Sequence, residues 1–481
     1  MKPSSAVSSR RPFAAGRPGI GGGPGPFVRK PSEFATKSRN PSVYFAGRVV
    51  EWVESDNQRK RFGERQKGFA MRKLRGALEQ VRLELGPDAW HNFRVDTSAA
   101  LLFAFFNVVI NQFYLTMALR AGATDFQAGL LAAAPAVGLM LSPIWASLIE
   151  RSQNPRPYMI WPNLIGRTLI LLPAFFGTPA VFVAVALAFQ LLMGVQAPAY
   201  AALIPRMYPP RHRGRLMGNV RVAMVLLMIP MAYLVGWWMD KAGSGGPLAS
   251  ASVLGVLSIL IFTGIRETVP ANAASGGLAS AGLRRGGFGN QWRLVRESRE
   301  LGLFLFATTL TGFCNIASQP LYQIIQVDRL ALSNVEIGWA RIVYYVCLLA
   351  SYLVVGWVID RFSARRTVIW GLAAFSAVPA LYAMFESYPA VLAGSAILAV
   401  GDAIWDIGFM TYVFRLAPGR EAVAFGLHMM LFGIRGTIGP LLSTALSGAG
   451  LPMSVLLGAA ALFGWAGVLL FLLLGRRTSE A

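Results

Sequence analysis

Twelve apolar stretches, each about 20 residues long, follow one another between residues 98 and 475. An α-helix needs roughly 20 apolar residues to cross the hydrocarbon layer of a bilayer, so each stretch predicts one transmembrane helix. The predicted spans are 98–119, 127–149, 158–178, 180–203, 217–239, 247–265, 301–326, 335–359, 367–386, 389–414, 421–446 and 453–475. The pattern therefore predicts an all-α integral membrane protein with 12 transmembrane helices.

Connections rich in positive charge alternate along the chain with connections that have few positive charges. The even-numbered connections carry most of the arginines, whereas the odd-numbered connections carry only Arg120, Lys241 and Arg329. Cytoplasmic loops of membrane proteins are enriched in Lys and Arg. The alternation predicts that both chain termini lie in the cytoplasm.

The two halves of the chain match each other at an offset of about 209–210 residues. Thr124 and Gly129, ahead of span 2, correspond to Ser333 and Gly338, ahead of span 8. Self-similarity over such a long period indicates two six-helix pseudo-repeats, at 96–265 and 301–475, joined by a linker at 266–300. Two homologous bundles can rock against each other around a shared central site.

Three segments lie outside the predicted bundles. Residues 1–67 are basic and rich in Gly, Pro and Ser, which predicts a disordered tail, and 476–481 form a short C-terminal tail. Residues 68–95 predict an amphipathic or juxtamembrane helix. That helix either lies on anionic lipids or docks on the protein's own loops. The acid-poor first 46 residues fit both a basic cytoplasmic tail and an organelle transit peptide.

Composition agrees with a membrane protein and argues against other classes. Hydrophobic residues make up 54% of the chain, charged residues 14%, and the mean hydropathy is +0.49. The net charge of +22 is explained by basic loops beside membrane helices, which makes nucleic acid an unsuitable partner. No phosphate-binding loop, metal-ligand spacing or Ser/His/Asp arrangement is visible, so we expect no enzyme activity, cofactor or metal.

The connection after span 8 carries a specific motif. Gly356, Asp360, Arg361, Arg365 and Arg366 follow the spacing G-x-x-x-D-R-x-x-x-R-R, and the connection after span 2 ends a degraded copy with Glu150 and Arg151. A carboxylate at a helix end can pair with arginines or with a neighbouring helix N-terminus. The motif therefore predicts a cytoplasmic gate; simple anchoring by positive charge would explain the arginines but not Asp360.

In this motif and in its two six-helix halves, over roughly residues 98–475, the chain resembles the major facilitator superfamily. The resemblance implies a carrier that works by alternating access, with spans 1, 4, 7 and 10 along a central cavity. It does not identify a subfamily. The drug–proton antiporter branch has an arginine where this chain has Gln190, and its Gly-Pro element belongs to span 5, whereas Gly439-Pro440 lies in span 11.

Four ionisable residues lie well inside spans 10 and 11, away from the span ends. They are Asp402, Asp406, His428 and Arg435. Because such groups are costly in hydrocarbon, each needs a function or a partner. Counting depth from the turn near Pro418 predicts an Asp402–Arg435 ion pair and an Asp406–His428 contact. These residues are candidates for proton coupling, and a structural clamp between the two helices is the other interpretation.

Two arginines inside spans also need an account. For Arg167, in span 3, we predict hydrogen bonds to nearby carbonyls or to Asn163 rather than binding of an anionic solute, because span 3 is peripheral in the resembling fold. For Arg341, in span 8, pairing with Glu336 and a place in the cavity wall remain two alternatives.

Uncharged polar residues mark a candidate substrate cavity. Amide pairs or triplets share one helix face in spans 1 and 7, and spans 4 and 10 add two amides and an indole. The candidates are Asn107, Asn111, Gln190, Gln196, Asn315, Gln319, Gln323 and Trp405. Such groups in an apolar cleft suit a neutral or amphipathic solute, and amide bonds between helices are the other interpretation.

The function that we predict is secondary active or facilitative transport of a small organic solute, with or without proton coupling, in either direction. The alternative is a non-transporting sensor or assembly factor that binds a partner through the N-terminal extension. We expect a monomer in the plasma (inner) membrane, or in an organelle membrane if residues 1–46 are a transit peptide.

Overall fold

The computed structural model describes residues 85–152, 154–209, 212–267, 296, 298–409, 412, 416 and 421–474. The predicted segments 1–67 and 476–481 and nearly all of the linker 266–300 lie outside these residues, as does the amphipathic stretch before Leu85. The first half comprises α2 (Pro87–Val108), the π-helical turn η1 (Val109–Phe113), α3 (Tyr114–Arg120), α4 (Asp125–Met140), α5 (Ser142–Ser152), α6 (Arg156–Leu169), α7 (Leu171–Phe176), α8 (Pro179–Met207), α9 (Arg213–Ala242) and α10 (Gly245–Phe262). The second half comprises α14 (Arg299–Ile324), η2 (Ile325–Arg329), α15 (Asn334–Phe362), α16 (Ala364–Met384), α17 (Tyr388–Ile404), η3 (Trp405–Phe409), α19 (Glu421–Gly448) and α20 (Met453–Leu474).

The helices confirm the predicted membrane spans. Within the described residues, eleven helices are long and apolar enough to cross a membrane, and a shorter apolar helix, α4, lies where span 2 was predicted. Span 2 is divided at Leu141 between α4 and α5. Pro143 explains the division, because it has no backbone N–H to donate to the carbonyl of Leu139.

Equivalent helices begin in the same way in the two halves. Thr124 and Gln127 form reciprocal side-chain to backbone hydrogen bonds at the start of α4. Ser333 and Glu336 do the same at the start of α15. Each capping box provides acceptors for two backbone N–H groups at a helix start, and it stabilises the helix by about 1 kcal/mol.

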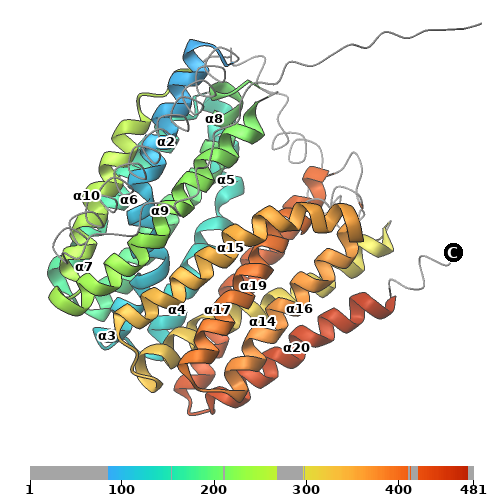
Figure 1. Ribbon diagram of the computed structural model, residues 1–481. Helices are drawn as coiled ribbons and strands as arrows, with labels where there is room; N and C mark the ends of the chain where they lie inside the picture. Colours follow the sequence, from blue (N-terminus) through green and yellow to red (C-terminus); the bar gives the residue numbers. More distant parts are fainter. Residues whose placement is uncertain are drawn as a thin grey trace, which may run out of the picture. The chain divides into compact units, whose positions relative to one another are not determined.

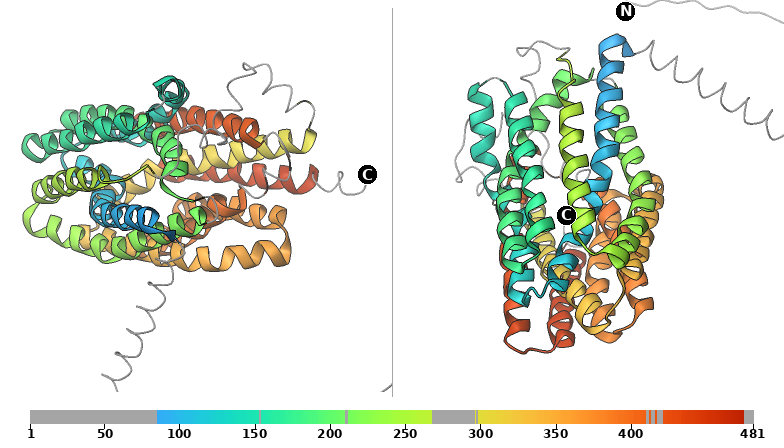
Figure 2. Two further views of the ribbon diagram at one scale, coloured as in Figure 1. Left: turned by 90° about the horizontal axis from the view of Figure 1, so that it is seen from above. Right: turned by 90° about the vertical axis from the view of Figure 1, so that its left-hand side faces the viewer.

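Packing inside each half confirms the internal repeat. In the first half α2 packs against α9 and α10, α6 against α8 and α10, and α4 against α8. In the second half the equivalent helices pair in the same way: α14 with α19 and α20, α16 with α17 and α20, and α15 with α17. Figure 1 shows the two groups, α2 to α10 and α14 to α20, and the views in Figure 2 show the same grouping from other directions.

Two helix pairs join the halves. α4 packs against α19, and α9 packs against α15, as Figure 1 shows for the second pair. Gly129 on α4 lies against Thr444 and the carbonyl of Pro440, while Gly338 on α15 lies against the carbonyl of Ala232. Because a side chain at either position would meet these atoms, glycine allows the close approach of the helices.

Arg167 is an interior crosslink of the first half. It is 3% exposed, and its guanidinium donates to the carbonyl of Gly255 at 2.7 Å and to Asn163 Oδ1 at 2.9 Å. The rings of Phe103 and Phe106 lie 4.7 and 5.4 Å from its central carbon. These contacts confirm the prediction that Arg167 bonds to carbonyls and to Asn163.

Replacing Arg167 by methionine is expected to destabilise the first half by about 2 kcal/mol, since buried acceptors lose their donor. The melting temperature of the purified protein in detergent should fall by several degrees. Lys241→Met, at an exposed charge, is the matched control and should melt like the unchanged protein. Equal melting of both variants would contradict a stabilising role for Arg167.

Candidate substrate cavity

A cavity of about 260 Å³ lies between α4 of the first half and the helices of the second half. Its wall combines small residues of α4 with amides, aromatic rings and two charged groups. The lining residues are Ala132, Pro135, Ala136, Gly312, Asn315, Ile316, Gln319, Leu372, Phe375, Asp402, Trp405, Phe432, Arg435 and Gly436. A few polar groups in a mostly apolar wall are typical of small-molecule sites.

The polar face of α14 supplies the amides of this wall. Asn315 and Gln319 line the cavity, and one turn further Gln323 accepts a hydrogen bond from Thr116 Oγ1 of the first half at 3.3 Å. Asn315 is 7% exposed, and its Oδ1 has no hydrogen-bond partner among the described residues. The periodicity of four residues therefore places two amides in the cavity and a third at the contact between the halves.

The two acids of span 10 face α15. The Tyr344 hydroxyl donates to Asp402 Oδ2 at 2.8 Å, and the Tyr352 hydroxyl donates to Asp406 Oδ2 at 2.5 Å. The two tyrosines are eight residues apart, so they lie on one side of α15. Asp402 also lines the cavity, whereas Asp406 is not among its lining residues.

Arg435 reaches the cavity from α19. It is 3% exposed, its Nη1 donates to the carbonyl of Thr308 at 2.6 Å, and its Nε has no hydrogen-bond partner among the described residues. The rings of Phe432 and Trp405 lie 5.4 and 5.8 Å from its central carbon. The described ion pairs do not include the predicted Asp402–Arg435 pair.

His428 is buried among aromatic rings rather than beside an acid. Its ring centre lies 4.1 Å from that of Phe409 and 5.2 Å from that of Trp405. The predicted Asp406–His428 contact and the predicted Asp402–Arg435 ion pair are therefore both wrong, because each of the four side chains has other neighbours. The reason is that α17 packs against α15 and α16, whereas α19 packs against α14 and α4, although the two helices are neighbours in sequence.

Four predicted cavity amides lie elsewhere. Asn107 on α2 and Gln190 and Gln196 on α8 are half-buried, and Asn111 in η1 is exposed. None of the four is among the residues that line the cavity. The cavity in this conformation is built mainly by the second half, so residues of the first half contribute only through α4.

Arg341 neither pairs with Glu336 nor lines the cavity. Glu336 is engaged in the capping box with Ser333, and Arg341 lies near the tyrosines Tyr344, Tyr345 and Tyr382 instead. Both alternatives considered for Arg341 are therefore absent from the described contacts.

Most of the described hydrogen bonds between the halves lie at the end formed by the odd-numbered connections. We call this end the outer gate, after the predicted orientation of the connections. Asp240, at the end of α9, accepts from the backbone N–H groups of Asn334 and Val335 at 3.0 and 2.9 Å and from Asn334 Nδ2 at 2.7 Å. Ser447, at the end of α19, donates to Asp125 Oδ2 at 2.6 Å. Arg120 Nη2 donates to the carbonyl of Leu332 at 2.5 Å. The outer gate is therefore closed by polar contacts.

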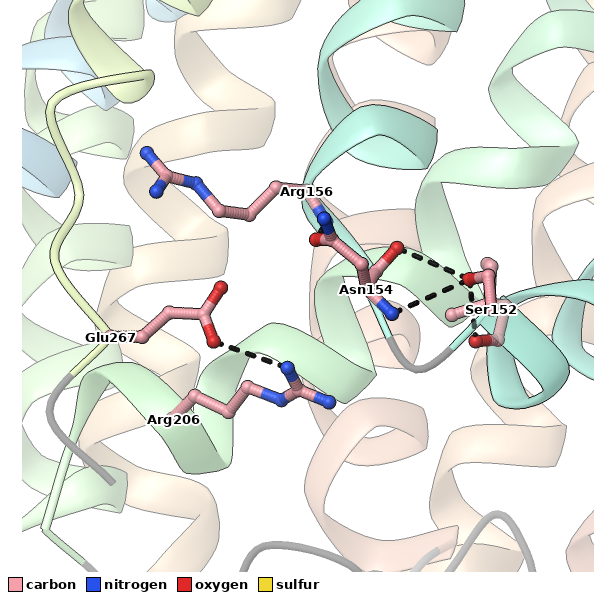
Figure 3. Close-up of polar contacts among 6 residues, drawn as sticks. Ser152, Asn154, Arg156, Arg206 and Glu267 are labelled. Atoms are coloured by element: carbon pink, nitrogen blue, oxygen red, sulfur yellow. Dashed lines mark hydrogen bonds and ion pairs between the residues drawn. The ribbon is translucent and has the colours of Figure 1, made fainter. Parts of the chain in front are cut away.

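At the arginine-rich end, the described polar contacts of the first half stay within that half. Figure 3 shows the ion pair of Arg206 with Glu267 at 3.1 Å and the bonds between Ser152 and Asn154. Arg156 donates to the carbonyl of Thr263 at 2.7 Å. These contacts fasten loops of the first half to one another.

A buried tyrosine also belongs to this end of the first half. The hydroxyl of Tyr208 donates to Asp96 at 2.8 Å. Burial, followed by the nearby Asp96 charge, raises the pKa of Tyr208 above its ordinary value. The tyrosine therefore stays protonated and remains a hydrogen-bond donor.

The predicted gate motif is described only in part. The side chains of Glu150, Arg151 and Asp360 and the surroundings of Gly356 lie outside what the structure describes. Arg365 donates to the carbonyl of Phe471 at 3.0 Å, Arg361 lies 5.7 Å from the ring of Trp357, and the Arg366 backbone N–H donates to Ser363. The described arginines thus contact their own half; the gating role of Asp360 stays a prediction.

Several residues around the cavity were not among the candidates predicted from the sequence. Tyr344 and Tyr352 hold the two acids, and Phe375 and Phe432 form apolar wall beside Trp405 and Arg435. The tyrosines carried a usable signal, because two hydroxyls eight residues apart share one face of an apolar span. The phenylalanines carried none, since single aromatic residues are common throughout such spans.

Two homologous six-helix halves, a polar cavity between them and a closed gate at one end define a membrane carrier. A family model described as the Major Facilitator Superfamily matches residues 97–327 and 304–481. The chain belongs to the Major Facilitator Superfamily, and the membrane fold and family make it a secondary transporter of small solutes. This agrees with the function predicted from the sequence and does not favour the sensor alternative.

Solved structures have the same fold at low sequence identity. A mutant of the nucleoside transporter NupG has a TM-score of 0.64 at 12% identity, and NupG itself has 0.61 at 12%; each match covers 79% of this chain and 98% of that one. A bacterial homologue of the human lysosomal transporter Spinster, inward-facing and unoccupied, has 0.58 at 13%, covering 80% and 98%. No curated protein matches this chain in sequence.

Proposed function

We propose that the cavity around Asn315, Gln319 and Trp405 is the substrate site of this carrier. The observation that supports it best is the convergence of amides, an acid and a base at a cavity between two halves. The described hydrogen bonds between those halves gather at the outer gate. If these bonds broke and others formed at the arginine-rich end, the same cavity would open through the outer gate instead. Alternating access requires such an exchange between the two openings.

Proton coupling is the second part of the proposal. Asp402 and Asp406 each accept a hydrogen bond from a tyrosine of α15, so a movement of α15 relative to α17 would change the stability of the charged carboxylates. Asp406 lies beside the cavity rather than in its wall, which suits a proton site separate from the solute. His428 and Arg435 remain further candidates. An Asp406→Asn variant tests this part: solute uptake driven by a pH gradient should lose its pH dependence.

The proposed orientation in the membrane is supported by the positive charges of the connections. We propose that the carrier lies in the plasma (inner) membrane as a monomer, with both termini in the cytoplasm, and that the part of segment 68–95 before Leu85 lies on anionic lipids. The later part of this segment packs on the protein itself, where Asn92 Nδ2 donates to the carbonyls of Met207 and Arg266. An organelle membrane is the alternative if residues 1–46 are a transit peptide. Reporter tags on the connection after Arg120 and on the C-terminal tail should appear on opposite sides of the bilayer.

The proposed substrate site is tested by a thermal-shift screen of small solutes on the purified protein, followed by flux into liposomes. Asn315→Ala and Gln319→Ala should each weaken the binding of a transported solute about tenfold, as expected for losing one buried hydrogen bond. Asp88→Asn, which removes an exposed partner of Arg266, is the control. Full flux in both amide variants would remove the cavity from the transport path.

A further inference from the structure

The cavity contains one acid and one base that are not paired with each other. Asp402 on α17 and Arg435 on α19 both line it. Tyr344 donates to Asp402 at 2.8 Å, and Arg435 donates to the Thr308 carbonyl at 2.6 Å, so each charge is held by a different neighbour. No described ion pair joins the two. They therefore present two separate recognition groups of opposite charge to whatever occupies the cavity.

Two buried polar atoms of the wall are also unsatisfied. Arg435 Nε is a donor, and Asn315 Oδ1 is an acceptor; neither has a hydrogen-bond partner among the described residues, and both side chains are more than nine-tenths buried. Leaving such an atom without a partner costs about 1–3 kcal/mol. A ligand that accepts a hydrogen bond near Arg435 and donates one near Asn315 would remove both costs.

The equal numbers of acidic and basic groups in and around the cavity wall limit which ligands it can accept. The nearby charged groups outside the wall are Asp406, bonded to Tyr352, and Arg341, beside the tyrosines of α15; His428 packs against Phe409. The wall itself holds one carboxylate and one guanidinium. A ligand with a single net charge would add an uncompensated charge to a site of low polarity, whereas a ligand with both charges keeps the balance.

We propose that the substrate is a small zwitterion, with an ammonium and a carboxylate on an apolar body. The ammonium lies at Asp402 and Asn315, the carboxylate at Arg435, and the apolar part against Trp405, Phe375 and Phe432. This inference rests on the proposed function, because it assumes that the cavity is the substrate site. Charge-assisted hydrogen bonds at both ends of the ligand give specificity, and the aromatic wall adds apolar contact.

The test compares three zwitterions of different charge separation: leucine, 4-aminobutyrate and glycylleucine. Each is measured beside its N-acetyl derivative, which lacks the positive charge, and its primary amide, which lacks the negative charge. Binding is followed by thermal shift of the purified full chain, and flux by uptake into liposomes. In at least one set the zwitterion should bind at least tenfold more tightly than either derivative.

Variants should change this preference in opposite directions. Asp402→Asn should weaken the zwitterion and leave the N-acetyl derivative unaffected, and Arg435→Gln should weaken the zwitterion and leave the amide unaffected. Asp88→Asn should bind like the unchanged protein. If Arg435→Gln does not fold, Asp402→Asn and the selectivity of the unchanged protein still decide.

The outcomes separate this inference from the proposed function. Absence of a preference for the zwitterion in all three sets would overturn the inference. Flux of a neutral or singly charged solute that Gln319→Ala abolishes would then leave the cavity as the substrate site. Zwitterion flux that is unaffected by Asp402→Asn, Arg435→Gln and Gln319→Ala would overturn both.

Discussion

Replacing Asp240 by alanine is expected to open the outer gate. The carboxylate accepts three hydrogen bonds from Asn334 and Val335 at the start of α15, and two of the donors are backbone N–H groups at a helix N-terminus. Charge-assisted bonds in such a position are the strong ones. Their loss should shift the equilibrium between closed and open gate by about 3 kcal/mol, or roughly 100-fold.

The shift can be measured without knowing the substrate. In a protein whose Cys314 and Cys347 are replaced by alanine, a cysteine at Gln319 reports whether the cavity is open to the outer side. A membrane-impermeant maleimide added from that side should react at least tenfold faster in the Asp240→Ala variant. Lys241→Ala, at the neighbouring exposed charge, is the matched control. Equal labelling rates in both would show that Asp240 does not hold the gate.

Replacing Gly338 by leucine should have a comparable effect through packing. A Cβ at this position would lie 2.8 Å from the carbonyl oxygen of Ala232 on α9, so the larger side chain keeps α9 and α15 apart. Since this helix pair joins the halves, we expect an outer gate that does not close and a transport rate at least tenfold lower. Distances between spin labels at the outer ends of α9 and α15 should increase.

Gly458 on α20 provides the control for this prediction. Nothing lies within 4 Å of a Cβ built there, so Gly458→Leu adds the same bulk without touching a neighbour. It should keep both the label distances and the flux of the unchanged protein. If Gly338→Leu also kept them, the close approach of α9 and α15 would not be needed for closure.

The sequence predicted the fold well because its signals are long and repeated. Apolar stretches set the spans, and the match between Thr124 and Ser333 located equivalent helix starts that the structure shows as equivalent capping boxes. Arg167 was predictable because its partners are local: Asn163 lies one turn away on the same helix. The break in span 2 was missed, although Pro143 was a visible cause.

The contacts around the cavity were harder to predict, because the depth of a residue in the membrane does not determine which neighbouring helix its side chain contacts. Asp402 and Arg435 both reach the cavity, yet their partners are Tyr344 and the Thr308 carbonyl rather than each other. Counting from a turn assigns a level to each residue, but which helices are neighbours depends on the packing of the whole bundle. Asn315 and Gln319 of span 7 line the cavity, whereas the predicted amides of spans 1 and 4 do not, since the cavity is built mainly by the second half.

The interruption of span 2 at Leu141 divides this span into two helical segments with different neighbours. The segment before it, α4, packs against α19 of the second half and against α8, whereas the segment after it, α5, packs against α8 of its own half. The missing N–H of Pro143 removes the bond that would stiffen the helix at this level. The chain can therefore bend at Leu141, which lets α5 change its angle to α4 while α4 keeps its close packing against α19 and α8.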